Sequence, residues 1–145
     1  MIILDIETSG FSQHSDSIIE VGAIKTLNGK VVDEFSALCR PKRSISPHIT
    51  YLTGITNAQL LREGREVKEV LNEFLGFVEE QDLIAYNSSF DKRFLQANDF
   101  RFGPLQWIDY YHSHVRHMDL DTPDKKLQTL KEHLGISSSR AHRAL

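Results

Sequence analysis

The sequence contains little cysteine, no long apolar run and no excess of positive charge. Its single cysteine, Cys39, excludes an internal disulfide and is typical of a protein in a reducing compartment. No apolar run is long enough to cross a membrane and no signal peptide opens the chain, so we expect a cytoplasmic protein with no membrane partner. The net charge of −3 is not the basic footprint of a protein that coats nucleic acid, but it allows an enzyme that grips one end of a strand.

The composition is that of an ordinary soluble domain. Hydrophobic residues make up 40% of the 145 residues and charged residues 26%, and a chain of this length can bury a sizeable core. No internal repeat and no linker between domains is visible. We therefore expect a single domain over 1–145.

Apolar runs alternate with helical patterns along the chain. Strands are expected over 1–8, 18–27, 30–39, 82–86 and 106–110, and helices from 56, over 66–79, from 88 and over 126–134. Asn28 and Gly29 separate the second and third strands as a hairpin turn, so these strands should be antiparallel. A hairpin followed by strands that alternate with helices predicts an α/β fold, namely a five-stranded mixed sheet with helices on both faces.

Two acidic residues lie at the end of the first expected strand. Alternation along the strand places Asp5 and Glu7 on one face, opposite a face formed by Ile2, Leu4 and Ile6. Neighbouring carboxylates on a buried strand repel each other and lose hydration, and a divalent cation is the partner that best fits both. A metal site at the mouth of a sheet usually does chemistry on phosphates. The alternative is a strand end that faces solvent and binds nothing.

Two further residues are weak candidates when each is taken alone. Asp91 lies in the first turn of a helix that directly follows a strand, where an acid is favoured by the helix dipole and can simply complete a cap after Ser88. His142 lies near the end of the chain, and a lone histidine there is usually a surface residue. Their meaning depends on the motifs in which they occur.

These residues belong to three motifs that occur together in a known family. The motifs are Asp-Ile-Glu-Thr at 5–8, Asn-Ser-Ser-Phe-Asp at 87–91 and His-Arg-Ala-Leu at 142–145. In this order they resemble the motifs of the DEDDh 3′–5′ exonucleases (DnaQ-like), especially the proofreading domains and epsilon-type subunits of bacterial DNA polymerase III. Ile-Ile-Glu-Val-Gly at 18–22 and Leu-Thr-Gly-Ile-Thr at 52–56 extend the resemblance over essentially the whole chain.

The resemblance implies a ribonuclease H-like sheet and a two-metal phosphodiesterase. Asp5 and Glu7 would hold two divalent cations, Mg²⁺ or Mn²⁺, with Asp5 shared between them, and Asp91 would support the second cation. His142, whose ordinary pKa is near neutral, would act as the general base. The implied reaction removes nucleoside 5′-monophosphates from the 3′ end of single-stranded DNA, in proofreading or repair, and a DNA polymerase subunit is the implied partner.

The resemblance also implies a set of substrate-binding residues. They are Thr8, Phe11, Leu52, Gly54, Ile55 and Asn87. The sequence leaves two of these assignments open. Phe11 could stack on a base or belong to the core, and Asn87 could contact the strand or satisfy the backbone at the turn between strand and helix.

The sequence departs from the family pattern in one respect that bears on mechanism. The family has a fourth acid five residues after the catalytic histidine, which corresponds to position 147, beyond Leu145. We expect either a domain cut short at its C-terminal helix or a protein that has lost this acid. The second case favours a weakened exonuclease-like domain that docks to a polymerase or another partner. An RNA-trimming exoribonuclease is the alternative within the enzyme class, because no residue reports clearly on the 2′-hydroxyl.

Two clusters of charged or titratable residues carry no assigned role. His112, His114 and His117 do not have the converging spacing of a zinc site, so a solvated surface is expected. The three cations of the 40–47 loop, Arg40, Lys42 and Arg43, could contact a nucleic-acid backbone or simply solvate the loop.

Overall fold

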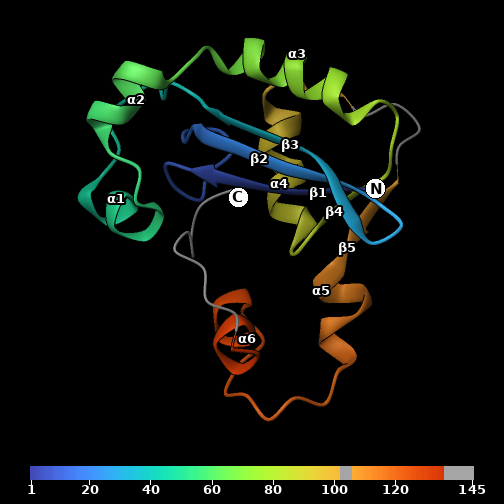
Figure 1. Cartoon of the computed structure of the whole chain (residues 1–145). Coiled ribbons are helices and arrows are strands. Elements are labelled where there is room, and N and C mark those ends of the chain that lie inside the picture. The colour runs from blue at the N-terminus through green and yellow to red at the C-terminus, as the bar shows by residue number, and fades with distance from the viewer. Residues whose placement is uncertain (102–105, 136–145) are drawn as a thin grey trace.

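A five-stranded mixed sheet forms the centre of the computed structural model, which describes residues 1–101 and 106–135 (Figure 1). Its strands are β1 (Ile2–Thr8), β2 (Ile18–Leu27), β3 (Lys30–Leu38), β4 (Leu83–Ala85) and β5 (Trp107–Asp109). They lie in the order β3-β2-β1-β4-β5, with antiparallel pairing among the first three and parallel pairing from β1 to β4 and from β4 to β5. The predicted five-stranded mixed sheet is confirmed.

The turn between β2 and β3 has the backbone that its two residues favour. Asn28 and Gly29 both have positive φ, 52° and 75°. A two-residue hairpin turn requires positive φ at both positions when its twist matches that of the flanking strands. The pairing of Leu27 with Lys30 closes the hairpin directly on this turn. The prediction of an antiparallel second and third strand is therefore confirmed, and its cause is local turn chemistry.

Helices connect and cover the strands. They are α1 (Pro47–Thr53), α2 (Asn57–Glu63), α3 (Val67–Val78), α4 (Ser88–Ala97), α5 (Tyr110–Ser113), a 3₁₀ turn η1 (Val115–His117) and α6 (Leu127–His133). Of these, α1, α5 and η1 were not expected. For α1 the local signals are present, since Ser46 caps its start, Pro47 follows at the first helical position and Gly54 ends it with φ 73°. Within the described part of the chain, no helix is long and apolar enough to cross a membrane.

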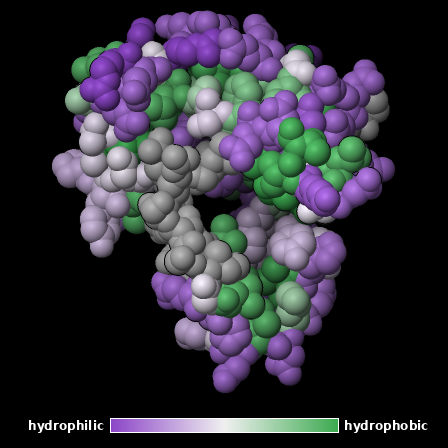
Figure 2. Space-filling view, viewed as in Figure 1, coloured by the Kyte–Doolittle hydropathy of each residue, from purple (hydrophilic) through white to green (hydrophobic). Residues whose placement is uncertain are grey.

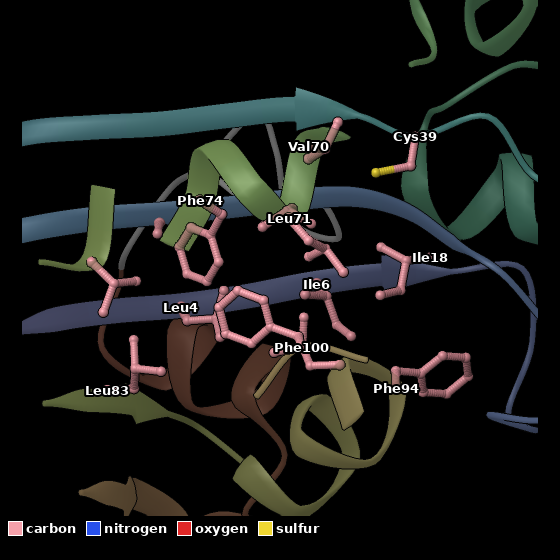
Figure 3. Close-up of a cluster of buried hydrophobic side chains, with 14 of the residues drawn as sticks. Leu4, Ile6, Ile18, Cys39, Val70, Leu71, Phe74, Leu83, Phe94 and Phe100 are labelled. Carbon is pink, nitrogen blue, oxygen red and sulfur yellow. The ribbon is translucent and has the colours of Figure 1, made fainter. Parts of the chain in front are cut away.

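The main core lies between one face of the sheet and two helices. Ile2, Leu4 and Ile6 of β1 point into this core, which also contains the apolar sides of α3 and α4 (Figure 3). Phe74 of α3 and Phe94 of α4 are fully buried there. On the other face of β1, Ile3 is 42% exposed and Asp5 is also exposed, so the alternation predicted for this strand is confirmed.

Three leucines of α3 and α6 are exposed. Leu75 of α3 is 47% exposed, because the buried stripe is completed instead by Phe77, whose ring lies 5.6 Å from that of Phe35. In α6, Leu130 is buried whereas Leu127 and Leu134 are exposed. Figure 1 shows that α5 and α6 extend away from the sheet.

The adjacent residues Phe74 and Leu75 provide a test of this packing. We expect Phe74→Ala to lower the free energy of unfolding by about 3–5 kcal/mol, because it leaves a cavity in the main core. Leu75→Ala, a matched control in the same helix, should cost less than about 1 kcal/mol because its side chain is already half in water. Urea denaturation followed by circular dichroism measures both, and equal losses for the two variants would contradict the described orientation of α3.

Candidate active site

The candidate site lies where β1 and β4 separate. The two parallel strands pair only at Ile2 and Ile3, after which the chain leaves β4 and enters α4. The N–H of Ile6 is therefore beyond the end of β4, and it donates to Oδ1 of Asp91 at 3.2 Å. This hydrogen bond joins residues that are 85 positions apart and places the first turn of α4 against the carboxyl end of β1. The carboxyl ends of parallel strands are common places for ligand sites.

The charges of Asp5 and Asp91 repel each other at this end of the sheet. Asp91 is 5% exposed, and burial raises the pKa of its carboxyl group well above the usual value, with the charges of Asp5 and then Asp109 raising it further. Burial raises the pKa of Asp5 to about 7, against a smaller lowering by the N–H of Ile6. Asp5 has one side open to solvent, but the protein atoms packed around its carboxylate still remove much of its hydration. The structure therefore brings together two of the predicted acids.

A third carboxylate, which was not among the predicted site residues, approaches from β2. Glu20 lies directly opposite Glu7 in the antiparallel pairing of β1 and β2, so the two side chains share the face that carries Asp5. Glu20 is only 2% exposed, and its charge contributes to the raised pKa of Asp5. The sequence did contain a sign of this residue, because Glu20 belongs to the Ile-Ile-Glu-Val-Gly motif on the strand that follows the first motif.

Asp109 at the end of β5 fixes the start of α4 and was also missed. Its Oδ2 accepts hydrogen bonds from both the N–H and the hydroxyl of Ser88, each at 3.1 Å. Its Oδ1 accepts from the N–H of His112 at 2.9 Å, and these hydrogen bonds lower the pKa of Asp109 against the effect of burial. Asp109 thus holds the helix that carries Asp91. No local pattern marks its contact with Ser88, because Ser88 belongs to a different strand–helix turn.

The loop that follows the acids is held in one conformation by Asp16. The carboxylate of Asp16 accepts from the N–H of Ser12 at 2.9 Å and from the hydroxyl of Ser9 at 3.2 Å. A side chain at Gly10 would meet this carboxylate, since a Cβ there would lie 2.4 Å from Oδ2 of Asp16. Thr8 donates its hydroxyl proton to the carbonyl of Gly10 at 2.6 Å. The loop after β1 is consequently rigid rather than adaptable.

Phe11, in this loop, is 84% exposed. This exposure excludes the core interpretation that the sequence left open and leaves the ring available to stack. Asn87 is exposed as well, and its Oδ1 accepts from the hydroxyl of Ser89 at 3.0 Å rather than from a backbone N–H at the turn. The capping interpretation of Asn87 is therefore wrong, whereas a contact with the strand stays a prediction.

The segment expected to form the other wall of the site divides into two kinds of residue. Leu52 is half-buried and Gly54 is exposed, so both are accessible. Ile55 is fully buried in a second apolar cluster with Ile19, Ile45 and Leu60, and its side chain cannot reach a substrate in this conformation. The prediction that the side chain of Ile55 contacts the substrate is therefore wrong for this structure, because this side chain fills the space beneath α1 and α2.

Histidine residues contribute little to the described site. His142 lies outside the described residues, so its predicted role stays a prediction. His112 approaches Asp109 at 3.1 Å through Nδ1, and Nδ1 of His114 lies 2.7 Å from the hydroxyl of Ser113. Over residues 1–101 and 106–135, no three His, Cys, Asp or Glu side chains come close enough together to hold a metal ion.

The pair formed by Asp5 and Asp91 nevertheless fits a divalent cation. Carboxylate oxygens are the ligands that hard cations such as Mg²⁺ and Mn²⁺ prefer. Both groups have raised pKa values, first because of burial and then because of neighbouring negative charge, and a cation between them would favour the ionised form of both and so lower both pKa values. Other donors would have to complete the coordination.

Comparison with known proteins identifies the family. The RNase_T family model, described as an exonuclease model, matches residues 2–145. The chain belongs to this exonuclease family. It is thus a phosphodiester hydrolase domain, as the DEDDh motifs predicted, and the expected ribonuclease H-like fold is confirmed. Divalent metal ions are general to the family.

Relatives of this exonuclease domain include large replication enzymes. It is 38% identical to the PolC-type DNA polymerase III of Thermotoga maritima, over 99% of this chain and 11% of the polymerase. It is 37% identical to the PolC-type polymerase of Clostridium perfringens, over 99% of this chain and 10% of that protein. The chain therefore spans about a tenth of the length of these curated relatives.

Solved structures agree with the fold. Exonuclease X in complex with 5′ overhanging duplex DNA is similar with a TM-score of 0.70 and 26% identity, over 95% of this chain and 75% of that one. The zinc-bound form of the E. coli Exonuclease I complex with single-stranded DNA gives a TM-score of 0.80 at 19% identity, over 99% of this chain and 36% of that chain. The latter likeness supports the fold alone.

The raised pKa values of the two acids predict how stability depends on pH and metal. The unfolded chain releases the Asp5 proton near pH 3.8, the ordinary pKa of an aspartate, whereas the folded protein retains it up to about pH 7. The metal-free protein should therefore lose stability as the pH rises from about 4 through 7. Asp5→Asn, which cannot ionise, should melt at a higher temperature than the wild type at pH 8 and close to it at pH 4.

Thermal unfolding in EDTA and in Mn²⁺ measures this effect. Mn²⁺ should raise the melting temperature of the wild type at pH 8 and change that of Asp5→Asn much less, because binding to the native state stabilises it. Equal pH profiles for the two proteins in EDTA would show that Asp5 ionises as it does in the unfolded chain.

Proposed function

We propose that this exonuclease domain removes nucleotides one at a time from the 3′ end of single-stranded DNA, in proofreading or repair. The observation that carries the proposal is the meeting of Asp5 and Asp91 at the open ends of β1 and β4. Membership of the exonuclease family and the 38% identity to PolC-type DNA polymerases support DNA as the substrate. A polymerase is the partner that these relatives favour.

In this proposal Asp5, Glu7 and Asp91 hold two divalent cations, Mg²⁺ or Mn²⁺. Bound cations would supply charge neutralisation at the phosphate and would make a bound water more acidic. Asp109 keeps α4, and with it Asp91, in place through its hydrogen bonds to Ser88. The fixed acids therefore need little rearrangement before the reaction, which is the general source of catalytic power at such sites.

The remaining residues position the terminal nucleotide and move the proton. Thr8, Phe11 and Asn87 contact the last nucleotide from one side, and Leu52 with Gly54 forms the opposite wall. His142 accepts a proton from the attacking water. The water oxygen bonds to phosphorus, the bond from phosphorus to the 3′ oxygen breaks, and the products are a nucleoside 5′-monophosphate and a strand shortened by one nucleotide.

Removal of either acid on β1 tests the catalytic assignment. We expect Asp5→Ala and Glu7→Ala to lower Mn²⁺-dependent nucleotide release from a single-stranded oligonucleotide by roughly a hundredfold or more, because transition-state charge is no longer neutralised. Asp33→Ala, an exposed acid on the edge strand β3, is the matched control and should keep wild-type activity. Circular dichroism checks that each variant is folded, and full activity in either β1 variant would defeat the proposal.

The choice between DNA and RNA needs a separate measurement. On oligonucleotides of the same sequence and length, we expect a higher initial rate with DNA than with RNA, because relatives at 38% identity are DNA polymerases. A higher rate on RNA would reassign the domain to RNA trimming and would leave the exonuclease assignment intact.

A further inference from the structure

The loop between β3 and α1 carries three cations that no acid neutralises. Arg40, Lys42 and Arg43 are all exposed, and none of the ion pairs in the described part of the chain includes them. The protein as a whole has a net charge of −3, so this loop is a local exception. Uncompensated cations grouped on one loop attract an anionic partner.

Hydrogen bonds join this cationic loop to the loop after β1. The guanidinium of Arg43 donates to the carbonyl of Ser15 at 3.3 Å, and the N–H of Lys42 donates to the hydroxyl of Ser17 at 3.1 Å. Because Asp16 fixes the loop that holds Ser15 and Ser17, the cations stand beside the segment that carries Phe11. Figure 1 shows the carboxyl end of β1 at the side of the molecule where α1 lies.

Two exposed aromatic rings lie on the segments that adjoin the cationic loop, one on the loop hydrogen-bonded to it and one on the helix that follows it. Phe11 and Tyr51 are each 84% exposed, more than any other large apolar side chain among the described residues. Tyr51 lies on the outer face of α1, directly after the cationic loop, whereas Ile49 and Thr53 of the same helix point inward. Among the described residues, neither ring makes a hydrogen bond or a contact with another ring.

We infer that the cationic loop and Tyr51 form a strand-guiding surface, which binds the unpaired nucleotides that precede the 3′ terminus. Cations beside exposed aromatic rings are the combination that binds single strands without regard to sequence, because phosphates pair with the cations and bases stack on the rings. This surface extends the proposed exonuclease site, on whose function it rests, from the terminal nucleotide to several nucleotides of single strand. Figure 2 shows one face of the molecule, on which hydrophilic side chains cover much of the described surface and hydrophobic ones lie among them.

Steady-state kinetics of the full 145-residue chain test this inference with two substrates. One is the oligonucleotide dT15, and the other is the p-nitrophenyl ester of thymidine 5′-monophosphate, which is too small to reach the surface. We expect Tyr51→Ala to raise KM for dT15 by about fivefold or more, which is the smallest effect expected for a lost base stack. The double variant K42Q/R43Q should raise it similarly and reduce the slope of log(kcat/KM) against log salt by about 1.4, since each single-strand phosphate contact contributes about 0.7.

The controls separate this surface from the catalytic site. Both variants should keep wild-type hydrolysis of the small ester. The variant K30Q/K68Q removes the same charge from the far end of the hairpin and from α3, which covers the opposite face of the sheet, and it should leave KM for dT15 unchanged. Two single variants test whether a change in loop conformation causes the effect. K42Q replaces a side chain for which the described residues show no hydrogen bond or ion pair, and R43K keeps the positive charge.

Two outcomes would overturn the inference. If Y51A and K42Q/R43Q behave like K30Q/K68Q on dT15, the surface does not guide the strand, and an acidic protein becomes the better candidate for the cations. If the wild type hydrolyses neither substrate, the proposed function fails, and fluorescence anisotropy of labelled dT15 in EDTA then decides the inference. Weaker binding by the two variants than by K30Q/K68Q supports the surface in that assay, and equal binding or no binding by the wild type overturns it.

Discussion

The hydrogen bond from the N–H of Ile6 to the carboxylate of Asp91 is the contact on which the site depends. β4 ends before it can pair with this part of β1, and a buried N–H without a partner would cost free energy comparable to a lost hydrogen bond. Asp91 provides the partner from the first turn of α4. This position brings Asp91 close enough to Asp5 for their negative charges to repel each other. The hydrogen bond that satisfies the N–H of Ile6 therefore also creates the acidic site.

The two faces of β1 serve different purposes. Ile2, Leu4 and Ile6 are buried against α3 and α4. Burial of this apolar face stabilises the fold and offsets the destabilising effect of the crowded carboxylates. The opposite face carries Asp5 and Glu7, with Glu20 brought alongside by β2. A strand that alternates so strictly lets one element support the fold and present the acids at the same time. Asp109 completes the arrangement by fixing α4 from the neighbouring strand.

Charge is distributed over this end of the molecule in a way that suits an anionic strand. Carboxylates alone would repel a phosphate backbone, and bound cations would reverse that repulsion only at the reaction centre. The uncompensated cations after β3 lie on a loop that is hydrogen-bonded to the rigid loop beyond the acids. In the proposed strand-guiding surface, these cations would attract the phosphates of a single strand. Local positive charge of this kind lets a chain with a net charge of −3 attract an anionic partner.

Much of this was fixed by local patterns in the sequence, and the rest by contacts between distant segments. Alternation in β1, the Asn28–Gly29 turn and the apolar stripe of α3 act within a few residues, so they could be read directly and were confirmed. The outward position of Leu75, the burial of Ile55 and the exposure of Phe11 depended on which segments pack nearby. The sequence by itself determined the strands, the acids and the family motifs. Only the tertiary structure decided that Asp5 meets Asp91 and that Asp109 and Glu20 join them, because those distances follow from the pairing of strands far apart in the chain.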